Sequence, residues 1–377
     1  MEKKIKLFVD AHSFDKEYQG VRTYIKQIYN ILLESYPALD IFFGATNVDQ
    51  IRTDFPLAKQ ENIIQYKNRL NLLRFFYDIP TLIKKHQIEF AHFQYLSPFG
   101  KKRCVYIVTT HDILFNDFKS DFSYTYRSTR NFLFKRGIRQ ADIRTTVSAY
   151  SKDRIDHYFH VPSNTIHVIP DGVNPHFASR FNSNEAAATH ISLKYNIRNY
   201  ILYVSRIEPR KNHLALMQAY VEAGLYKKNI SMVFIGKESI AVKELKEYEG
   251  ILSRDQKKHI HWISQVEQDD LDGFYKGCLV FAYVSKGEGF GIPPLEAAVS
   301  KVPVLCSNQT AMSDYDFFKP HFFNPYDVQE LIQKLNNLLN NPPGSLQLEK
   351  IANEVLSRYS WESSADRLFK LITGYKT

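Results

Sequence analysis

The sequence predicts an α/β protein made of two doubly wound parallel sheets that face a central cleft. Short β-branched or aromatic runs alternate with helical patterns along the whole chain of 377 residues, which is typical of parallel sheets covered by helices. A chain of this length is too long for one ordinary core, because domains usually hold about 100 to 200 residues. Motifs with glycine or charged residues also follow several expected strands, at the ends where such sheets bind ligands.

The expected strands fall into two sets along the chain. Those of the first domain, residues 1–190, are 5–9, 40–43, 90–93, 106–110, 144–147 and 166–169. Those of the second domain, residues 191–358, are 201–204, 232–235, 259–263, 279–284 and 302–306. The polar, alanine-rich segment 174–191 is expected to be the linker. A C-terminal helix within 359–377 is expected to pack back toward the first domain.

Composition limits the function classes. Hydrophobic residues make up 44% and charged residues 24% of the chain, which are values of a globular protein and exclude global disorder. The formal net charge is +9, and residues 127–144 hold six Lys and Arg against one acid, interleaved with apolar residues. This stretch is either a helix that docks on anionic lipid or an ordinary solvated helix face. No zinc spacing or RNA-binding signature supports nucleic acid as a partner.

The three cysteines, Cys104, Cys278 and Cys306, are scattered and lie in or beside apolar runs. They are expected to be reduced thiols, because neither a disulfide framework nor a zinc spacing is present. The N-terminal residues enter a strand without a signal-peptide pattern, and no apolar run reaches the roughly 18 residues of a membrane span. A cytoplasmic protein is expected, and peripheral contact with the inner membrane face stays open.

The glycine loop at 287–296 carries two carboxylates, Glu288 and Glu296, at an expected junction of strand and helix. Pro293 or Pro294 suits the first turn of that helix. Glycine allows close approach of a ligand, and a helix start attracts an anion, so both carboxylates are expected to face one pocket. A plain glycine turn is the alternative. A dinucleotide fingerprint is disfavoured, because it would follow the first strand of a βαβ unit.

Cations follow the first strand of the second domain. Arg206 stands at the carboxyl end of this strand, and Lys211 precedes a helix whose expected N-cap is Asn212. A pyrophosphate leaving group needs such charges, since they stabilise the departing oxygen. A solvated basic loop is the alternative, and Arg210 could form a local salt bridge with Glu208.

The first domain has two matching features. Gly20 leads into a helix, and His111 stands at the carboxyl end of a strand beside Asp112. A histidine next to an acid usually marks a satisfied hydrogen bond, but this one falls at the expected cleft. No residues show metal-ligand spacing, so no metal is expected. The cations and backbone N–H groups would then hold the pyrophosphate.

Together these motifs resemble the retaining glycosyltransferases of family 4, the glycosyl transferases group 1, which have the GT-B fold of two Rossmann-like domains. The matching segments are 20–24, 108–112, 146–148, 168–173, 203–212, 288–296, 302–304 and 359–361. The two glutamates with their glycine loop, combined with the upstream Arg and Lys, are the most specific part of the resemblance.

The resemblance implies a role for each matching position. Arg206 and Lys211 would bind the pyrophosphate of the donor, with Gly20 close to it. Glu296 would bind the ribose, and Val266 would contact the base. The sugar would be held by Glu288 and by the backbone of Phe290, Gly291 and Ile292. His111 would contact the sugar near the reacting carbon. The residues expected to act in catalysis are therefore His111, Glu288, Arg206 and Lys211.

The expected function is sugar transfer from a nucleotide-diphosphate sugar, with UDP favoured over GDP, to a glycan or lipid-linked acceptor in cell-surface polysaccharide synthesis. The resemblance implies retention by front-face attack, and no pair of free carboxylates of the glycosidase kind is found. No cofactor is expected. A nucleotide-sugar epimerase and a non-catalytic sugar-nucleotide-binding protein are the alternatives.

The sequence departs from the family pattern at three places. Lys301 stands where the family commonly has Gly, Asp171 replaces the usual Asn, and segment 309–320 lacks the usual Pro-Glu pair. The last departure leaves the identity of the donor open.

Overall fold

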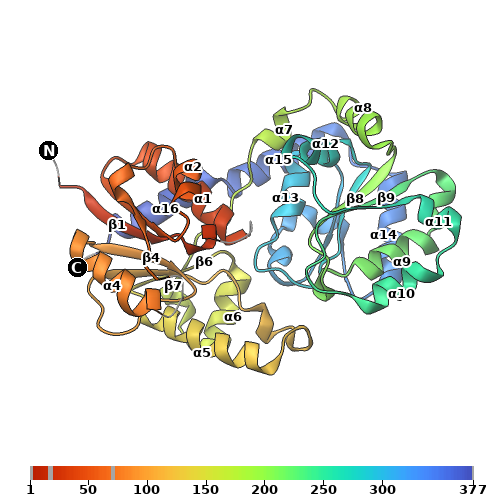
Figure 1. The fold of residues 1–377 in the computed structure, drawn as a ribbon. Helices are drawn as coiled ribbons and strands as arrows, with labels where there is room; N and C mark the ends of the chain where they lie inside the picture. The colour runs from red at the N-terminus through yellow and green to blue at the C-terminus, as the bar shows by residue number, and fades with distance from the viewer. Residues whose placement is uncertain (1–2, 16–19, 69–72, 376–377) are drawn as a thin grey trace. The chain divides into compact units, whose positions relative to one another are not determined.

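The computed structural model describes residues 3–15, 20–68 and 73–375, which form two compact units (Figure 1). The first unit combines the chain up to Asp171 with the segment that starts at Trp361. The second unit is Gly172–Ser360. Each unit contains a parallel sheet with helices packed on it, which confirms the predicted α/β class with two Rossmann-like sheets.

The described part of the first unit has a seven-stranded parallel sheet in the order β3-β2-β1-β4-β5-β6-β7. Its strands are β1 (Ile5–Asp10), β2 (Leu39–Ala45), β3 (Ile63–Gln65), β4 (Phe90–Gln94), β5 (Val105–Thr109), β6 (Ile143–Thr146) and β7 (Ile166–Val168). Its helices are α1 (Gly20–Ser35), α2 (Val48–Asp54), the π-helix η3 (Arg74–Asp78), α4 (Ile79–His86), α5 (Tyr124–Gln140), α6 (Ala149–Phe159) and α16 (Trp361–Thr373). The central strands are mostly apolar and mostly buried, because helices cover both faces.

The described part of the second unit has a six-stranded parallel sheet in the order β10-β9-β8-β11-β12-β13. Its strands are β8 (Tyr200–Val204), β9 (Ser231–Ile235), β10 (Ile260–Ile263), β11 (Val280–Tyr283), β12 (Val304–Ser307) and β13 (Phe322–Phe323). Its helices are α7 (His176–Ser179), α8 (Asn184–Tyr195), α9 (His213–Glu222), α10 (Lys243–Ile251), α11 (Arg254–Lys258), α12 (Gln268–Gly277), α13 (Ile292–Val299), α14 (Val328–Asn340) and α15 (Ser345–Arg358). The strand order reverses between β8 and β11, and sheets of this kind bind ligands at such a switch point.

Every strand expected from the sequence is present, with small shifts at the ends. The two edge strands β3 and β13 were not expected. They have three and two residues, which is too short for a periodic pattern to show.

The expected linker at 174–191 is wrong in its position. The chain passes from the first unit to the second at Asp171–Gly172, and the segment that follows holds α7 and most of α8. Helix α8 packs closely on α12, because a Cβ atom at Gly277 would lie 2.9 Å from the backbone nitrogen of Ala188. Small residues in α8 therefore reflect close helix packing, although their composition resembles that of a linker.

The C-terminal helix α16 belongs to the first unit, where it packs on α1. The rings of Tyr36 and Phe369 lie 4.3 Å apart, and the Ser364 hydroxyl donates a hydrogen bond of 2.7 Å to the carbonyl of Pro170. These contacts join the last helix to the beginning of the chain and to the segment after β7.

Candidate functional site

A buried ion pair joins the loops that follow β8 and β11 at the switch point of the second unit. The Lys211 ammonium donates to Glu288 Oε1 at 2.6 Å, and the hydroxyl of Tyr283 donates to the same oxygen at 2.8 Å. Arg210 Nη1 donates to Glu288 Oε2 at 3.2 Å. Lys211 is 8% exposed and Glu288 is 7% exposed. Two residues expected to bind the donor therefore contact each other directly inside the unit.

The backbone after β8 places Lys211 beside the glycine loop. Pro209 opens the 3₁₀ turn Pro209–Lys211, and Asn212 then adopts a left-handed conformation with φ +61° before α9 begins. Asn212 stands at the expected N-cap position, but its side chain does not cap the helix. Its amide instead donates to the carbonyl of Pro325 at 2.8 Å. The expected N-cap position of Asn212 is therefore confirmed, but the side chain is used to hold the segment at Pro325.

Arg210 connects three parts of the site. Its Nη1 donates to the carbonyl of Gly287 at 2.7 Å, and its Nη2 donates to Glu208 Oε1 at 2.6 Å. The pair with Glu208 is the local salt bridge considered from the sequence, and it exists together with the contact to Glu288. Arg210 therefore fixes the start of the glycine loop, a function that sequence reasoning missed.

Opposing effects set the charge of the pair. Burial alone would raise the pKa of Glu288, but the positive charges of Lys211 and Arg210 outweigh this effect and hold that pKa at about 2. Burial lowers the pKa of Lys211, and the Glu288 carboxylate opposes that shift. Glu288 is therefore ionised throughout the physiological pH range.

The glycine loop is shaped by the segment that the sequence marked as a departure. Gly291 has φ +99° and directly precedes α13, where Pro293 lies in the first turn, as expected. The Tyr315 hydroxyl donates to the carbonyl of Phe290 at 2.7 Å, and the backbone N–H of Glu288 donates to Thr310 Oγ1 at 2.8 Å. Sequence reasoning missed both Thr310 and Tyr315.

Thr310 is itself unusual, because a β-branched residue with φ +55° is a rare conformation. Such backbone strain persists where surrounding contacts enforce it, and it is common next to functional groups. The hydrogen bond from Glu288 is one such contact. No pattern in the sequence would have signalled this role.

Glu296 has a different partner from Glu288. It lies in α13, half-buried, and its Oε2 accepts a hydrogen bond of 2.6 Å from the hydroxyl of Tyr275 in α12. Burial raises the pKa of Glu296 to about 7, although the bond from Tyr275 opposes this rise. The carboxylate therefore has its proton equilibrium near neutral pH.

Arg206 and Val266 occupy strand ends of the same unit. Arg206 follows β8 with an exposed side chain, for which the described structure shows no hydrogen bond or ion pair. Val266 lies half-buried between β10 and α12. The backbone of Ile292 begins α13. Among the residues described, no group of three His, Cys, Asp or Glu side chains is arranged to hold a metal ion.

His111 belongs to the first unit, where a buried polar network holds it at the end of β5. Its Nε2 lies 2.7 Å from Gln94 Oε1, and the Gln94 amide lies 3.3 Å from His92 Nε2. Since an amide oxygen only accepts, Nε2 of His111 carries the proton. Burial lowers the pKa of His111 to about 3, so the imidazole is neutral and Nδ1 is an acceptor. The ring of Tyr24 in α1 packs edge-on against it at 4.9 Å.

Gly20 opens α1, as expected, and is exposed. No described atom lies within 4 Å of the place where its Cβ would be. Asp171, which stands where the family has Asn, is buried at the end of the first unit. Burial raises the pKa of Asp171 to about 7, and its Oδ1 has no hydrogen-bond partner in the described structure.

Comparison with family models divides the chain into two matching regions. Residues 18–177 match the model described as Glycosyltransferase Family 4, and residues 186–355 match the model described as Glycosyl transferases group 1. The pair Lys211–Glu288, with Arg206 and Glu296, lies in the second region, while Gly20 and His111 lie in the first.

Among curated proteins, the serotype-specific mannosyltransferase WbdA of Escherichia coli is 31% identical over 236 residues, which cover 60% of this chain and 28% of that protein. The aligned region thus spans little more than a quarter of that relative. The O-antigen chain mannosyltransferase B of Escherichia coli is 27% identical over 302 residues, covering 73% of this chain and 74% of that protein.

Solved structures share the fold at low sequence identity. Sucrose-phosphate synthase from Thermosynechococcus elongatus aligns with a TM-score of 0.76 and 17% identity, covering 98% of this chain and 99% of the other. Anabaena HepE in complex with UDP aligns with a TM-score of 0.75 and 14% identity, covering 98% and 100%. Both likenesses concern the arrangement of the backbone.

Proposed function

Because the chain belongs to the glycosyltransferases of group 1 and family 4, we propose that it moves a hexosyl group from a nucleoside-diphosphate sugar to a glycan or lipid-linked acceptor in polysaccharide synthesis. The observation that carries this proposal is the buried cluster of Lys211, Arg210 and Glu288 at the ends of β8 and β11. It places the cations Lys211 and Arg210 beside the glycine loop that leads into α13, where they would stabilise the negative charge of a diphosphate. Relatives named mannosyltransferases make mannose the first sugar to test.

We propose a role for each residue from its position and from the family resemblance. Arg206, exposed at the end of β8, and Lys211 bind the pyrophosphate, while Glu296 accepts hydrogen bonds from the ribose hydroxyls. The family resemblance also implies that His111, which is neutral and hydrogen-bonded to Gln94, contacts the donor sugar. The roles of Gly20, Val266, Phe290, Gly291 and Ile292 remain those that the family resemblance implies.

We propose retention of configuration without a covalent glycosyl-enzyme and without a metal. Glu288 is held by Lys211, Arg210 and Tyr283, so its carboxylate is a poor nucleophile. The leaving phosphate oxygen would then accept the proton of the acceptor hydroxyl on the same face of the sugar. Turnover that survives a chelator and a product with the donor's anomeric configuration are the expected results.

Arg206→Ala offers the cleanest test, because this side chain is exposed and contributes little to stability. We expect at least tenfold weaker binding of nucleoside diphosphates by calorimetry, with the melting temperature unchanged. Arg254→Ala, which removes another exposed cation of the same unit, is the control and should bind normally. Unchanged binding in Arg206→Ala would contradict the assignment of the pyrophosphate site.

Two alternatives have distinct outcomes. Incubation with a nucleotide sugar alone would yield an epimer if the protein were an epimerase, whereas a glycosyltransferase leaves the donor sugar's configuration intact. A non-catalytic binding protein would bind nucleotide sugars without transfer to any acceptor. A thermal-shift screen against UDP-, GDP- and ADP-sugars identifies the donor, since a ligand of the native state raises apparent stability.

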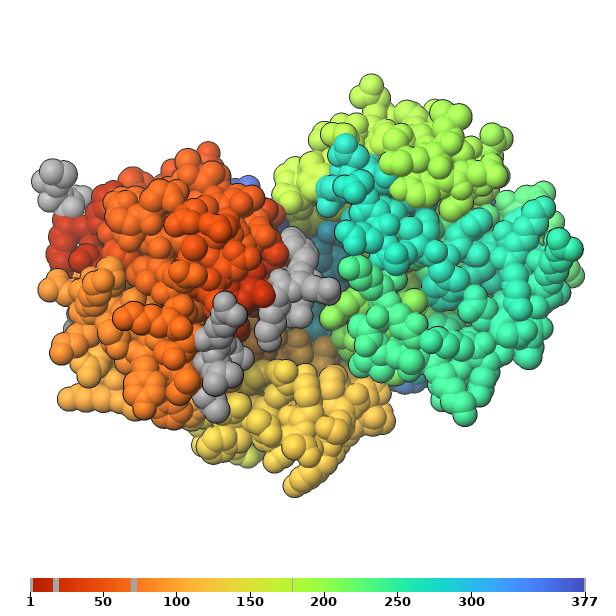
Figure 2. Space-filling model, viewed as in Figure 1, coloured from red at the N-terminus to blue at the C-terminus, as the bar shows by residue number. Residues whose placement is uncertain are grey.

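We also propose peripheral contact of α5 with an anionic membrane. Tyr124 and Phe132 on α5 are 77% and 68% exposed, and the yellow segment of Figure 2 that contains them lies on the surface of the first unit. Arg136 of this stretch stabilises the fold, because it donates hydrogen bonds to the carbonyls of Ser97 and Pro98 at 3.1 and 3.0 Å. No described helix is both long and apolar enough to cross a membrane.

Vesicle co-sedimentation tests the membrane proposal. Phe132→Ser should reduce binding to vesicles containing phosphatidylglycerol, while Leu346→Ser, which changes a leucine 82% exposed in the second unit, should not. Binding that is equally strong to neutral vesicles would remove its electrostatic basis.

A further inference from the structure

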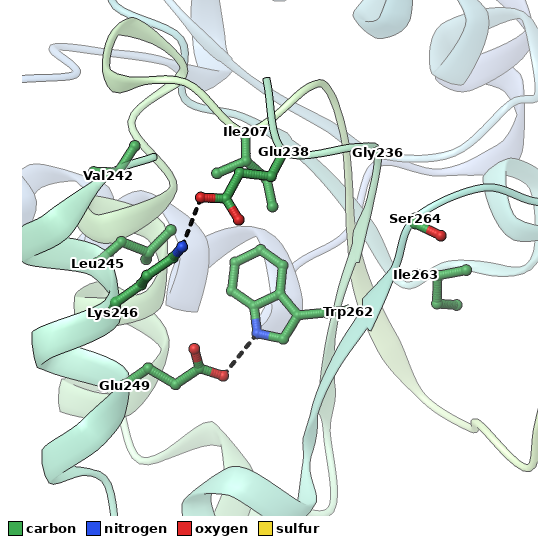
Figure 3. A pocket seen from close by; sticks show the side chains of 10 residues that line it. All are labelled: Ile207, Gly236, Glu238, Val242, Leu245, Lys246, Glu249, Trp262, Ile263 and Ser264. Atoms are coloured by element: carbon green, nitrogen blue, oxygen red, sulfur yellow. Dashed lines mark hydrogen bonds and ion pairs between the residues drawn. The ribbon is translucent and has the colours of Figure 1, made fainter. Parts of the chain in front are cut away.

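A pocket of about 350 Å³ lies at the carboxyl ends of β8, β9 and β10 (Figure 3). Ile207 lines it from the segment after β8, Glu238 from the segment after β9 and Trp262 from β10. Leu245 and Glu249 line it from one face of α10. The pocket is thus open at the strand ends and walled by a helix.

The indole of Trp262 gives the pocket a flat and fixed wall. It stacks on the ring of Phe234 with centroids 4.2 Å apart and an angle of 16° between the planes. Its Nε1–H donates to Glu249 Oε1 at 3.0 Å, as Figure 3 shows. A rigid aromatic wall of this kind favours a planar ligand such as a nucleobase.

The two carboxylates of the pocket differ in their charge balance. Glu238 forms an ion pair of 2.7 Å with Lys246, and the two side chains are 40% and 61% exposed. Glu249 accepts a hydrogen bond from the neutral indole, and the described structure shows no cation paired with it. Glu249 therefore presents uncompensated negative charge next to the aromatic wall.

We propose that this pocket receives the base of the donor nucleotide and that Glu249 selects guanine. The inference rests on the proposed function. Guanine presents two adjacent N–H donors, N1–H and the N2 amino group, which a carboxylate accepts together in a charge-assisted pair. Uracil presents one N–H between two carbonyl oxygens, which the carboxylate repels, and adenine places an acceptor nitrogen beside its amino group. The pocket thus favours a guanosine nucleotide over the uridine nucleotide that the sequence favours.

The location agrees with the other proposed contacts. Ile207 directly follows Arg206, the proposed pyrophosphate ligand, and Ser264, which also lines the pocket, lies two residues before Val266. A nucleotide with its pyrophosphate at Arg206 can therefore extend across the ends of β8 and β9 into the pocket.

Calorimetric titration with GDP, UDP and ADP tests this inference on the full chain. The unmodified protein should bind GDP at least tenfold more tightly than UDP or ADP. Glu249→Gln keeps an acceptor for Trp262 but loses the charge, so the ratio of GDP to UDP affinity should fall about tenfold. Glu247→Gln, on the same helix but outside the pocket lining, is the control and should leave the ratio unchanged.

The outcomes separate the inference from the function on which it rests. Preference for UDP or ADP, or an unchanged affinity ratio in Glu249→Gln, would overturn the guanine pocket and leave the nucleotide site intact. Failure of all three nucleotides to bind would overturn the proposed donor site itself.

Discussion

Replacing Glu288 by Gln should destabilise the second unit strongly, because it leaves the buried ammonium of Lys211 without its counter-charge. Glu288→Gln preserves the shape of the side chain, so packing changes little. The pKa of Glu288 falls from its ordinary value of 4.5 to about 2, which at about 1.4 kcal/mol for each pKa unit corresponds to about 3 kcal/mol. Removal of one partner from a buried ion pair typically costs about 3 to 5 kcal/mol, which agrees.

The pH dependence gives this prediction a second, sharper test. A carboxyl group whose pKa is lowered by folding stabilises the native state above its unfolded pKa, and this contribution disappears as the pH falls through the folded value. The stability difference between the unmodified protein and Glu288→Gln should therefore be full above pH 5 and shrink toward pH 2.

Urea unfolding followed by tryptophan fluorescence measures this difference, since Trp262 reports the second unit and Trp361 reports the first. At roughly 2 to 4 °C for each kcal/mol in a unit of this size, the melting temperature should fall by about 6 to 12 °C. Glu247→Gln, an exposed glutamate of α10, should change stability by less than about 0.5 kcal/mol. A loss below about 1 kcal/mol in Glu288→Gln, or a difference independent of pH, would refute the reasoning.

Three further changes test the site and its support. Burial raises the pKa of Glu296 to about 7, so the affinity for a nucleotide should increase from pH 6 to pH 8 as the carboxylate ionises. Calorimetric titration of Glu296→Gln should show a much weaker dependence of this affinity on pH. Gly236→Ala should lower the free energy of unfolding by about 3 kcal/mol in urea, because φ is +147° and the new Cβ would lie 2.1 Å from the carbonyl oxygen of Ser205. As the control, Gly250→Ala in α10 places its Cβ more than 4 Å from any described atom and should raise the free energy of unfolding by up to about 1 kcal/mol. Tyr315→Phe should lower stability by about 1 to 3 kcal/mol, since the carbonyl of Phe290 loses a buried donor, and an unchanged melting temperature would argue against that contact.

The strands of both sheets were predictable because each is a short apolar run between helical patterns. Buried parallel strands need β-branched and aromatic residues on both faces, and this requirement is visible in the local sequence. Edge strands β3 and β13 have too few residues to show it. The boundary at Asp171–Gly172 was also missed, because the residues that follow form helices whose small side chains serve close packing in the second unit.

The site was predictable residue by residue but not contact by contact. Glu288 and Lys211 stand out in the sequence because each lies near a strand end, yet they are 77 residues apart and nothing local shows that they pair. The role of Thr310 depends on its left-handed backbone and on the position of Glu288, which only the folded unit defines.

One departure from the family pattern has a clear local cause. Lys301 has φ +58°, a left-handed conformation that glycine adopts without strain and that costs other residues roughly 1 kcal/mol. Its ammonium lies 2.7 Å from a carboxylate oxygen of Glu349 on α15, an exposed pair that offsets little of this cost. The glycine usual in the family is therefore explained by the backbone at this position.

The sequence by itself determined the two-sheet fold and the positions of the charged residues at strand ends, since both depend on short-range patterns of polarity and glycine. Only the tertiary structure decided which charged side chains are paired inside the unit and which are exposed. Lys211 and Glu288 compensate each other, whereas Arg206 stays exposed and Glu249 faces a pocket beside Trp262. The reason is that burial and charge pairing depend on distances between loops far apart in the chain, and these distances arise when the strands align in the sheet.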